Sequence, residues 1–178
     1  MLLPINNILC PTDFSNASIT ALKQAIELCD HFGATLCLLH VVPSISRLTC
    51  SVPLDVNRET CELDLSEYED NLHRCAQQKL REVISDYIPT GMKFCTIVGE
   101  GDAATEIMRT AEDQHASLIV LAAHGMTGWR NIEFGSVAER VVRRSSLPVL
   151  IIHAPRESAI TAGKEHSTDE EQKVEAVA

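Results

Sequence analysis

Short apolar runs alternate with longer amphipathic segments along most of the chain, and this alternation is the feature that most restricts its fold. Each apolar run is too short for a core helix and is rich in Ile, Val and Leu, as expected of a buried strand. The five runs are 7–11, 35–42, 93–98, 117–124 and 148–153. Strands that alternate with helices in this way form βα units and a mostly parallel sheet, so the sequence predicts the α/β class.

The amphipathic segments have the spacing of helices. In the first of them, apolar residues recur three or four positions apart, and Gly33 follows as a stop signal. The predicted helices are 17–32, 65–87, about 102–111 and about 136–145. No internal repeat appears, so we expect one domain over residues 1–155. Residues 156–178 carry three basic and six acidic side chains, a composition that predicts an acidic, disordered tail.

Composition excludes several classes of function. The chain has 178 residues and a formal net charge of −10, which disfavours nucleic acids and anionic membrane surfaces as partners. The longest apolar run, 118–123, is far below the roughly 20 residues that cross a bilayer, and residues 1–11 lack the basic segment of a signal peptide. The seven cysteines are odd in number and contain no C-x-x-C pair, which favours reduced thiols. We therefore expect a soluble cytoplasmic protein.

One motif imitates a dinucleotide-binding fingerprint. The stretch from Gly99 to Ala104 matches G-x-G-x-x-A between a predicted strand and a predicted helix. However, Asp102 would place a carboxylate where a pyrophosphate should meet the helix, and the next strand ends without an acid for a ribose. The better interpretation is a turn followed by Asp102 as the N-cap.

A second glycine-bearing segment has two open interpretations. A predicted buried strand ends near His124, and the loop that follows delivers Gly135 and Ser136 to the start of a helix. Backbone N–H groups at such a helix start favour an anion such as phosphate. Alternatively, Ser136 and Glu139 form an S-x-x-E capping box, and the glycines serve tight turns.

These motifs together resemble those of the universal stress protein A family, over residues 5–154. The opening strand and turn, ILCPTDFS at 8–15, look like the family's first motif, and LLHVV at 38–42 looks like the end of its second strand. The nucleotide-binding branch has G-x-x-G, nine residues and G-[S/T]. Gly125, nine intervening residues and Gly135-Ser136 fit that signature, whereas Ala122 replaces its first glycine.

The resemblance implies a binding site for ATP, or for AMP or ADP, with Mg²⁺ as the accompanying divalent ion. Asp13 would face the ribose and phosphates and hold the ion, with Pro11 and Thr12 shaping the pocket. Val41 would contact the adenine. The phosphates would be held by backbone amides of Gly125, Gly135, Ser136 and Val137. Ala122 is small enough for a close approach, but a need for positive φ there would be strained.

The resemblance also implies the arrangement of the sheet. The family's order is 3-2-1-4-5, in an open five-stranded parallel sheet with helices on both faces, a Rossmann-like fold of the adenine nucleotide alpha hydrolase type. Ligands bind such sheets at the carboxyl ends beside the point where strand order reverses, between the first and fourth strands. Asp13 and Gly125 lie just past those two ends.

The function implied is that of a stress-response regulator whose nucleotide state alters its contacts with an unidentified protein partner. The family forms homodimers through the last strand, from Pro148 to His153 in this chain. Two alternatives remain open: a slow ATPase, for which the chain offers no P-loop lysine and no catalytic residue is assigned, and a dimeric adaptor that binds no nucleotide.

Two histidines lie near the ends of predicted strands. His40 is flanked by apolar residues, which favours a structural histidine satisfied by backbone groups. His124 sits beside the proposed site, where a polar strand-end contact is favoured over acid–base chemistry because no partner carboxylate can be named.

Basic side chains and the single tryptophan are further candidates. Arg130 lies in the glycine loop and is expected to be solvated rather than bound to phosphate. Trp129 could cover the phosphate loop or lie at an interface. Arg140, Arg143 and Arg144 share one helical face near the helix C-terminus, which favours interaction with the helix dipole and solvent.

Overall fold

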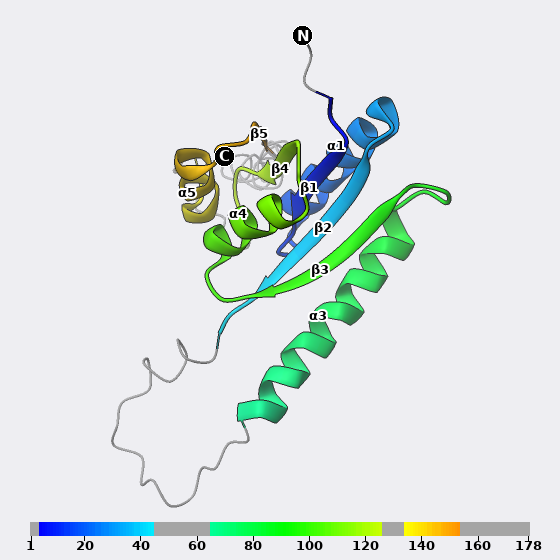
Figure 1. Ribbon diagram of the computed structural model, residues 1–178. Coiled ribbons are helices and arrows are strands. Elements are labelled where there is room, and N and C mark those ends of the chain that lie inside the picture. The colour runs from blue at the N-terminus through cyan, green and yellow to red at the C-terminus, as the bar shows by residue number, and fades with distance from the viewer. Residues whose placement is uncertain (1–3, 45–64, 126–133, 154–178) are drawn as a thin grey trace, which may run out of the picture.

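The computed structural model describes residues 4–44, 65–125 and 134–153, and these form an α/β fold around one parallel sheet (Figure 1). The sheet has five strands in the order β3-β2-β1-β4-β5, as the family resemblance implied. The strands are β1 (Asn7–Pro11), β2 (Thr35–Val42), β3 (Phe94–Glu100), β4 (Leu118–Ala122) and β5 (Val149–Ile152). Every pair of neighbours is parallel. Strand order therefore reverses between β1 and β4.

Helices connect the strands and cover both faces of the sheet. They are α1 (Asn16–Phe32), α3 (Leu65–Tyr87), α4 (Ala103–Asp113) and α5 (Ser136–Arg144). One face of the sheet packs against α1 and α3, through Leu22 and Leu80 among others. The other face packs against α4 and α5, through residues such as Ile107 and Val141. This confirms the prediction of helices on both faces.

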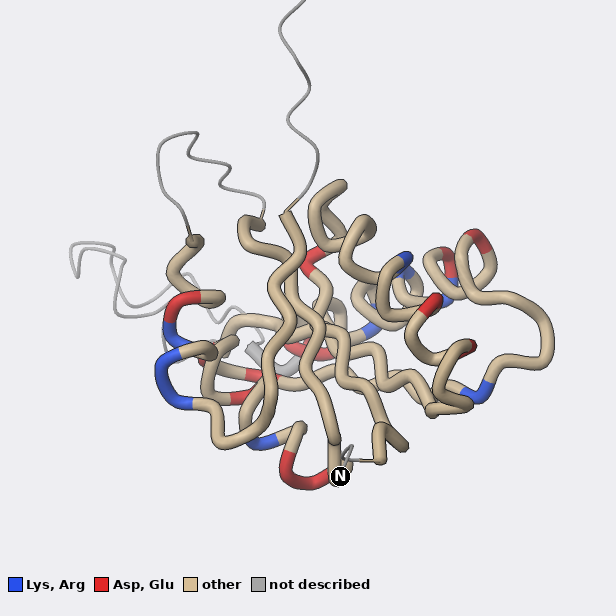
Figure 2. Tube along the Cα trace, turned by 90° about the horizontal axis from the view of Figure 1, so that it is seen from above, with Lys and Arg blue, Asp and Glu red and all other residues tan. Residues whose placement is uncertain are grey.

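Alternation along the strands divides the core between the two faces. In β2, Leu36 and Leu38 belong to the cluster on the α1 and α3 side, whereas Cys37 and Leu39 belong to the other cluster. Both faces of a parallel sheet are buried, so its strands are apolar at nearly every position. Figure 2 shows the consequence: charged residues lie on the helices, on the connections and at the end of β3, whereas β1, β2 and β4 contain none.

The ends of the elements differ slightly from the predicted ones. Strand β3 continues two residues beyond 98 because Gly99 and Glu100 still pair with Val41 and Val42 of β2. Strand β4 is shorter than predicted and ends at Ala122. The expected tail, 156–178, lies outside the described residues. No helix within 4–44, 65–125 or 134–153 has the length and hydropathy needed to cross a membrane.

Candidate functional site

The carboxyl ends of β1 and β4 bring together residues more than 100 positions apart in the chain. Pro11 is the last residue of β1 and Ala122 the last of β4, and both are buried in adjacent strands. Asp13 follows β1 in the chain, and Gly125 follows β4. This is the reversal point of the sheet, where open parallel sheets bind their ligands.

Gly125 lies directly against the carboxylate of Asp13. A Cβ atom built on Gly125 would collide with Asp13 Oδ2. Any residue other than glycine at 125 would therefore displace the carboxylate or the loop. The structure thus brings these two predicted site residues into contact.

The turn after β1 fixes the other oxygen of the same carboxylate. Asp13 Oδ1 accepts hydrogen bonds from Ser15 N at 3.0 Å and from Ser15 Oγ at 2.6 Å. Ser15 is also the N-cap of α1, since its hydroxyl accepts from Ser18 N. Phe14, between them, has φ +64°, a conformation that is rare for a bulky residue. One short turn therefore sets both the start of α1 and the orientation of the Asp13 carboxylate.

Thr12 anchors this turn to β2. Its amide donates to the Leu39 carbonyl at 2.8 Å, and its buried hydroxyl lies 3.0 Å from Ser18 Oγ. The Thr12 carbonyl is 2.8 Å from His40 Nδ1. This confirms the prediction that His40 is satisfied by the backbone. Burial lowers the pKa of His40 below its ordinary value, although the Thr12 hydrogen bond and Asp13 act in the opposite direction.

The start of α5 corrects one of the two interpretations of the glycine loop. Gly135, not Ser136, is the N-cap, so the predicted Ser136–Glu139 capping box is wrong. The Gly135 amide donates to the Ala123 carbonyl at 2.7 Å, which ties the helix start to the end of β4. Ser136 and Val137 form the first turn, exposed and half-buried respectively. A glycine N-cap supplies no side-chain acceptor for the amides of that turn.

Ala122 stands where the family signature has its first glycine, and its backbone is ordinary strand. It pairs with Ile152 of β5 and is absent from the positive-φ residues of the described chain. The strain considered for this position therefore does not arise. Val41 lies half-buried in β2, one residue beyond His40 and at the same carboxyl edge of the sheet.

Two arginine predictions have different outcomes. Arg140 does not simply face solvent, because its guanidinium forms two hydrogen bonds with the Asp102 carboxylate. Arg143 follows the prediction more closely and forms an exposed pair with Glu139 at 2.8 Å.

Asp102 is the N-cap of α4, as predicted, and Gly101 before it has φ +119°. The stretch that imitates a dinucleotide fingerprint is thus a turn and a helix cap.

His124 lies beside aromatic rings at the same edge. Its ring centroid is 6.5 Å from that of His153, which is in turn 6.0 Å from the ring of Phe134. Trp129 and Arg130 belong to residues 126–133, outside the described part of the chain.

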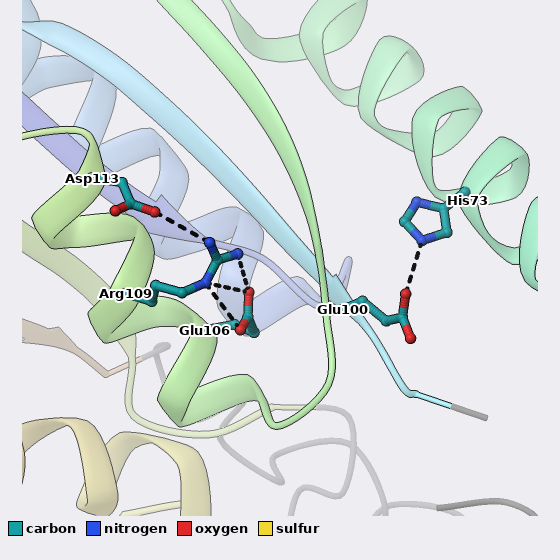
Figure 3. Close-up of polar contacts among 5 residues, drawn as sticks. All are labelled: His73, Glu100, Glu106, Arg109 and Asp113. Atoms are coloured by element: carbon teal, nitrogen blue, oxygen red, sulfur yellow. Dashed lines mark hydrogen bonds and ion pairs between the residues drawn. The ribbon is translucent and has the colours of Figure 1, made fainter. Parts of the chain in front are cut away.

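Other charged groups form pairs on α4 and between α3 and the carboxyl end of β3. Figure 3 shows Arg109 of α4 between Glu106 and Asp113, at 2.6 and 3.2 Å, and His73 of α3 facing Glu100 at 3.7 Å. All three pairs are partly exposed. The two pairs of Arg109 lie within α4, and the His73–Glu100 pair joins α3 to β3. Among the residues described, no group of three or more His, Cys, Asp or Glu side chains has the arrangement of a metal site. Asp13 would thus hold a metal only together with ligand oxygens.

Comparison with known proteins identifies the family of this chain. The model of the Universal stress protein family matches residues 4–153. The chain belongs to the universal stress protein family. Universal stress protein MJ0531 of Methanocaldococcus jannaschii is 34% identical over 149 residues, which cover 84% of this chain and 82% of that protein.

Solved structures of universal stress proteins share the fold. MJ0577, also from Methanocaldococcus jannaschii, is 31% identical over 151 residues, covering 82% of this chain and 93% of that protein. Its solved structure has a TM-score of 0.72 and covers 85% of this chain and 98% of its own. A universal stress protein of Archaeoglobus fulgidus in complex with dAMP has a TM-score of 0.55 at 20% identity, covering 84% and 99% of the two chains.

Sequence reasoning missed three contributors to this universal stress protein site. Ser15 was detectable, because Asp-x-Ser is a typical Asx-turn pattern before a helix. The positive φ of Phe14 has no signal in its residue type. Lys79 of α3, whose Nζ lies 5.5 Å from the Phe14 ring centroid, is brought there only by the packing of α3.

Proposed function

We propose that this family member binds ATP, or AMP or ADP, at the carboxyl edge between β1 and β4, and acts in the cytoplasm as a nucleotide-dependent regulatory dimer. The observation that carries the proposal is the contact between Gly125 and the Asp13 carboxylate at the reversal point of the sheet. It joins the family's opening motif to its glycine signature. The dAMP complex of the Archaeoglobus protein supports the proposal at the level of fold.

Each candidate residue has a proposed task at this edge. Asp13 faces the ribose and phosphates, and a carboxylate oxygen together with phosphate oxygens is a usual ligand set for Mg²⁺. When bound, Mg²⁺ would neutralise phosphate charge. Val41 supplies an apolar and backbone contact for the adenine, and the buried Pro11 and Thr12 form the floor of the pocket. The small side chain of Ala122 allows the ligand to approach the end of β4 closely.

The start of α5 is the proposed phosphate site. A helix N-terminus with a glycine N-cap presents backbone N–H groups to an anion without a competing side-chain acceptor. Gly125, Ser136 and Val137 would supply these amides, whereas the Gly135 amide is already bonded to the Ala123 carbonyl and Gly135 serves as the N-cap. Such a site needs no basic surface, which reconciles a single nucleotide with a net charge of −10.

Calorimetry with ATP, ADP and AMP, with and without Mg²⁺, tests the proposal. We expect binding by the wild type and its loss in Gly135→Val, because the two Cγ methyl groups of Val extend beyond a Cβ that is already in van der Waals contact, at 3.4 Å, with the Ala123 carbonyl. Lys93→Val is the matched control, since it adds the same side chain at an exposed position before β3. Absence of binding at millimolar nucleotide with Mg²⁺ would contradict the proposal. Phosphate release that stays at background while ATP binds would separate a regulator from a slow ATPase.

The dimer is proposed to form through β5. In the described sheet this strand pairs with β4 on one side, and its sequence, VLII, is apolar throughout. Leu150 is 38% exposed, so an unpaired β5 edge would invite aggregation. Antiparallel pairing with β5 of a second copy would remove that edge.

Light scattering coupled to gel filtration tests this interface. We expect a dimer for the wild type and a monomer for Leu150→Lys. Phe94→Lys is the matched control, because Phe94 is 43% exposed on β3, at the opposite edge of the same sheet. A monomeric wild type, or dissociation by the Phe94 variant instead, would contradict the assignment.

A further inference from the structure

The turn that carries Asp13 adopts a conformation that its sequence does not favour. Phe14 has φ +64° without being a glycine, and its amide donates to Thr12 Oγ1 at 3.1 Å. A bulky residue stays in this region only when its surroundings hold it there. The side chains that hold Phe14 therefore also decide where the preceding carboxylate points.

His40 touches the residues on both sides of Asp13. Its Nδ1 lies 2.8 Å from the Thr12 carbonyl, and because a carbonyl oxygen only accepts, Nδ1 carries the hydrogen. Its ring packs on the Phe14 ring, with centroids 4.3 Å apart and planes inclined by 34°. One half-buried side chain on β2 thus fixes the residue before Asp13 and the residue after it.

Lys79 lies near the Phe14 ring that packs on His40. Its Nζ is 5.5 Å from the Phe14 centroid, so α3 adds a cation–π contact to the contact that β2 makes. Within the described part of the chain, Lys79 and Asp13 are the charged groups that act on His40. The stack of His40, Phe14 and Lys79 is therefore continuous from β2 to α3.

We propose that His40 is a positioning residue for the ligand site: it holds Thr12 and Phe14 so that the Asp13 carboxylate faces Gly125. The proposal rests on the proposed nucleotide binding for its effect on affinity. With Oδ1 fixed by Ser15, a rigid turn leaves Asp13 Oδ2 directed at Gly125, where the ligand and its metal ion would meet it. Preorganisation of this kind improves binding because less order is lost when the ligand arrives.

Three substitutions separate the two contacts of His40. His40→Phe keeps a ring against Phe14 and removes the donor to Thr12. His40→Asn keeps a donor at the position of Nδ1 and removes the ring. His40→Ala removes both. Cys37→Ala is the control, because Cys37 is buried in the same strand but packs on its other face.

Nucleotide affinity is measured for these variants in the wild-type chain and in Asp13→Asn. We expect His40→Ala to weaken ATP binding about tenfold, with His40→Phe and His40→Asn between it and the wild type, whereas Cys37→Ala has little effect. In the Asp13→Asn chain the same His40 changes should have less than about a twofold effect, since the carboxylate they position is gone. Equal losses in both chains, or no loss in either, would overturn the proposal.

Hydrogen exchange of the ligand-free protein gives a readout that does not need a nucleotide. The amides of Phe14 and Ser15 are bonded to Thr12 Oγ1 and Asp13 Oδ1, so we expect both to exchange faster in His40→Ala and unchanged in Cys37→Ala. If the wild type binds no nucleotide, the proposed function fails, and this measurement alone decides on His40. Unchanged exchange of both amides in His40→Ala overturns the positioning role.

Discussion

Arg140 on α5 forms a two-pronged hydrogen bond with Asp102, the N-cap of α4. Its Nη1 lies 2.9 Å from Asp102 Oδ2, and its Nη2 bonds Oδ1. The same Oδ1 accepts from the amide and hydroxyl of Thr105, at 3.1 and 2.8 Å. The Arg140 guanidinium and the Thr105 hydroxyl hold the pKa of Asp102 well below its ordinary range. One carboxylate thus starts α4 and ties it to the helix of the proposed phosphate site.

Substitutions at Asp102 should separate its cap from its ion pair. Asp102→Ala removes both, and loss of the N-cap alone lowers the free energy of unfolding by about 1 kcal/mol. Asp102→Asn keeps a good N-cap and loses the charge, so it should be destabilised less. Denaturant unfolding measures both. Glu139→Gln is the control, because its exposed i,i+4 pair with Arg143 is worth at most about 0.5 kcal/mol. A wild-type stability for Asp102→Ala would show that neither contact matters.

Buried thiols should react far more slowly than an exposed one. Burial raises the pKa of Cys10 to about 12 and that of Cys29 to about 11, and the thiolate is the reactive form. Cys75 is exposed on α3. We expect maleimide to label Cys75 at least about 100-fold faster than Cys10 at neutral pH, with equal labelling in denaturant as the control. Peptide mass spectrometry reads each site, and similar rates in the folded protein would be inconsistent with this core.

The fold was predictable because the pattern of apolar residues is strong and local. The strands 7–11 and 35–42 have the predicted ends, since each is a mainly apolar run that begins at a polar residue and ends at or just before a proline. The end of β3 was not, because Gly99 and Glu100 look like turn residues and are kept in the sheet by pairing with β2. Local pattern does not report the partner strand.

The site was predictable only where a motif records it. The contact between Asp13 and Gly125 was predictable because the family resemblance supplied the strand order, which no local spacing of residues contains. The pairing of Arg140 with Asp102 joins residues 38 positions apart and depends on how α4 and α5 pack, so helix position alone suggested a solvated arginine. The Ser136 capping box failed because Gly135 takes the cap through its bond to the Ala123 carbonyl.

Stability should fall as the pH drops below the ordinary pKa of histidine, and His40 should account for part of the fall. Burial lowers the pKa of His40 in the folded state, so between that lowered pKa and about 6.5 the unfolded chain binds more protons than the folded one. Stability therefore rises with pH in this window. One group contributes at most about 1.4 kcal/mol per pH unit.

Denaturant unfolding of the wild type and His40→Phe between pH 7.5 and 5 tests this. The variant retains the other histidines, so the difference between the two curves isolates His40. We expect the wild type to lose more stability than His40→Phe as the pH falls. Parallel curves would mean that His40 has the same pKa in both states.

The contact between Gly125 and Asp13 gives the sharpest test of the site. In Gly125→Ala the new methyl group collides with Asp13 Oδ2, so the carboxylate or the loop must move. Because Gly125 is exposed and Oδ2 is the end of a side chain, we expect a modest loss of stability, about 0.5–1 kcal/mol. A displaced carboxylate should separately weaken nucleotide binding severalfold. In Asp13→Ala the collision is gone, so adding Gly125→Ala should cause little further loss of stability.

A glycine at the other end of the loop is the control for this test. Gly135 has φ −68°, which any residue adopts, and a Cβ there is 3.4 Å from the Ala123 carbonyl and therefore close to ordinary contact. Gly135→Ser, in which the new residue is also a good N-cap, should thus be destabilised less than Gly125→Ala in thermal unfolding. Gly125→Ala could instead be equally destabilising with and without the Asp13 carboxylate. Position 125 would then require glycine for its backbone conformation, and the contact with Asp13 would not be the reason that it excludes a side chain.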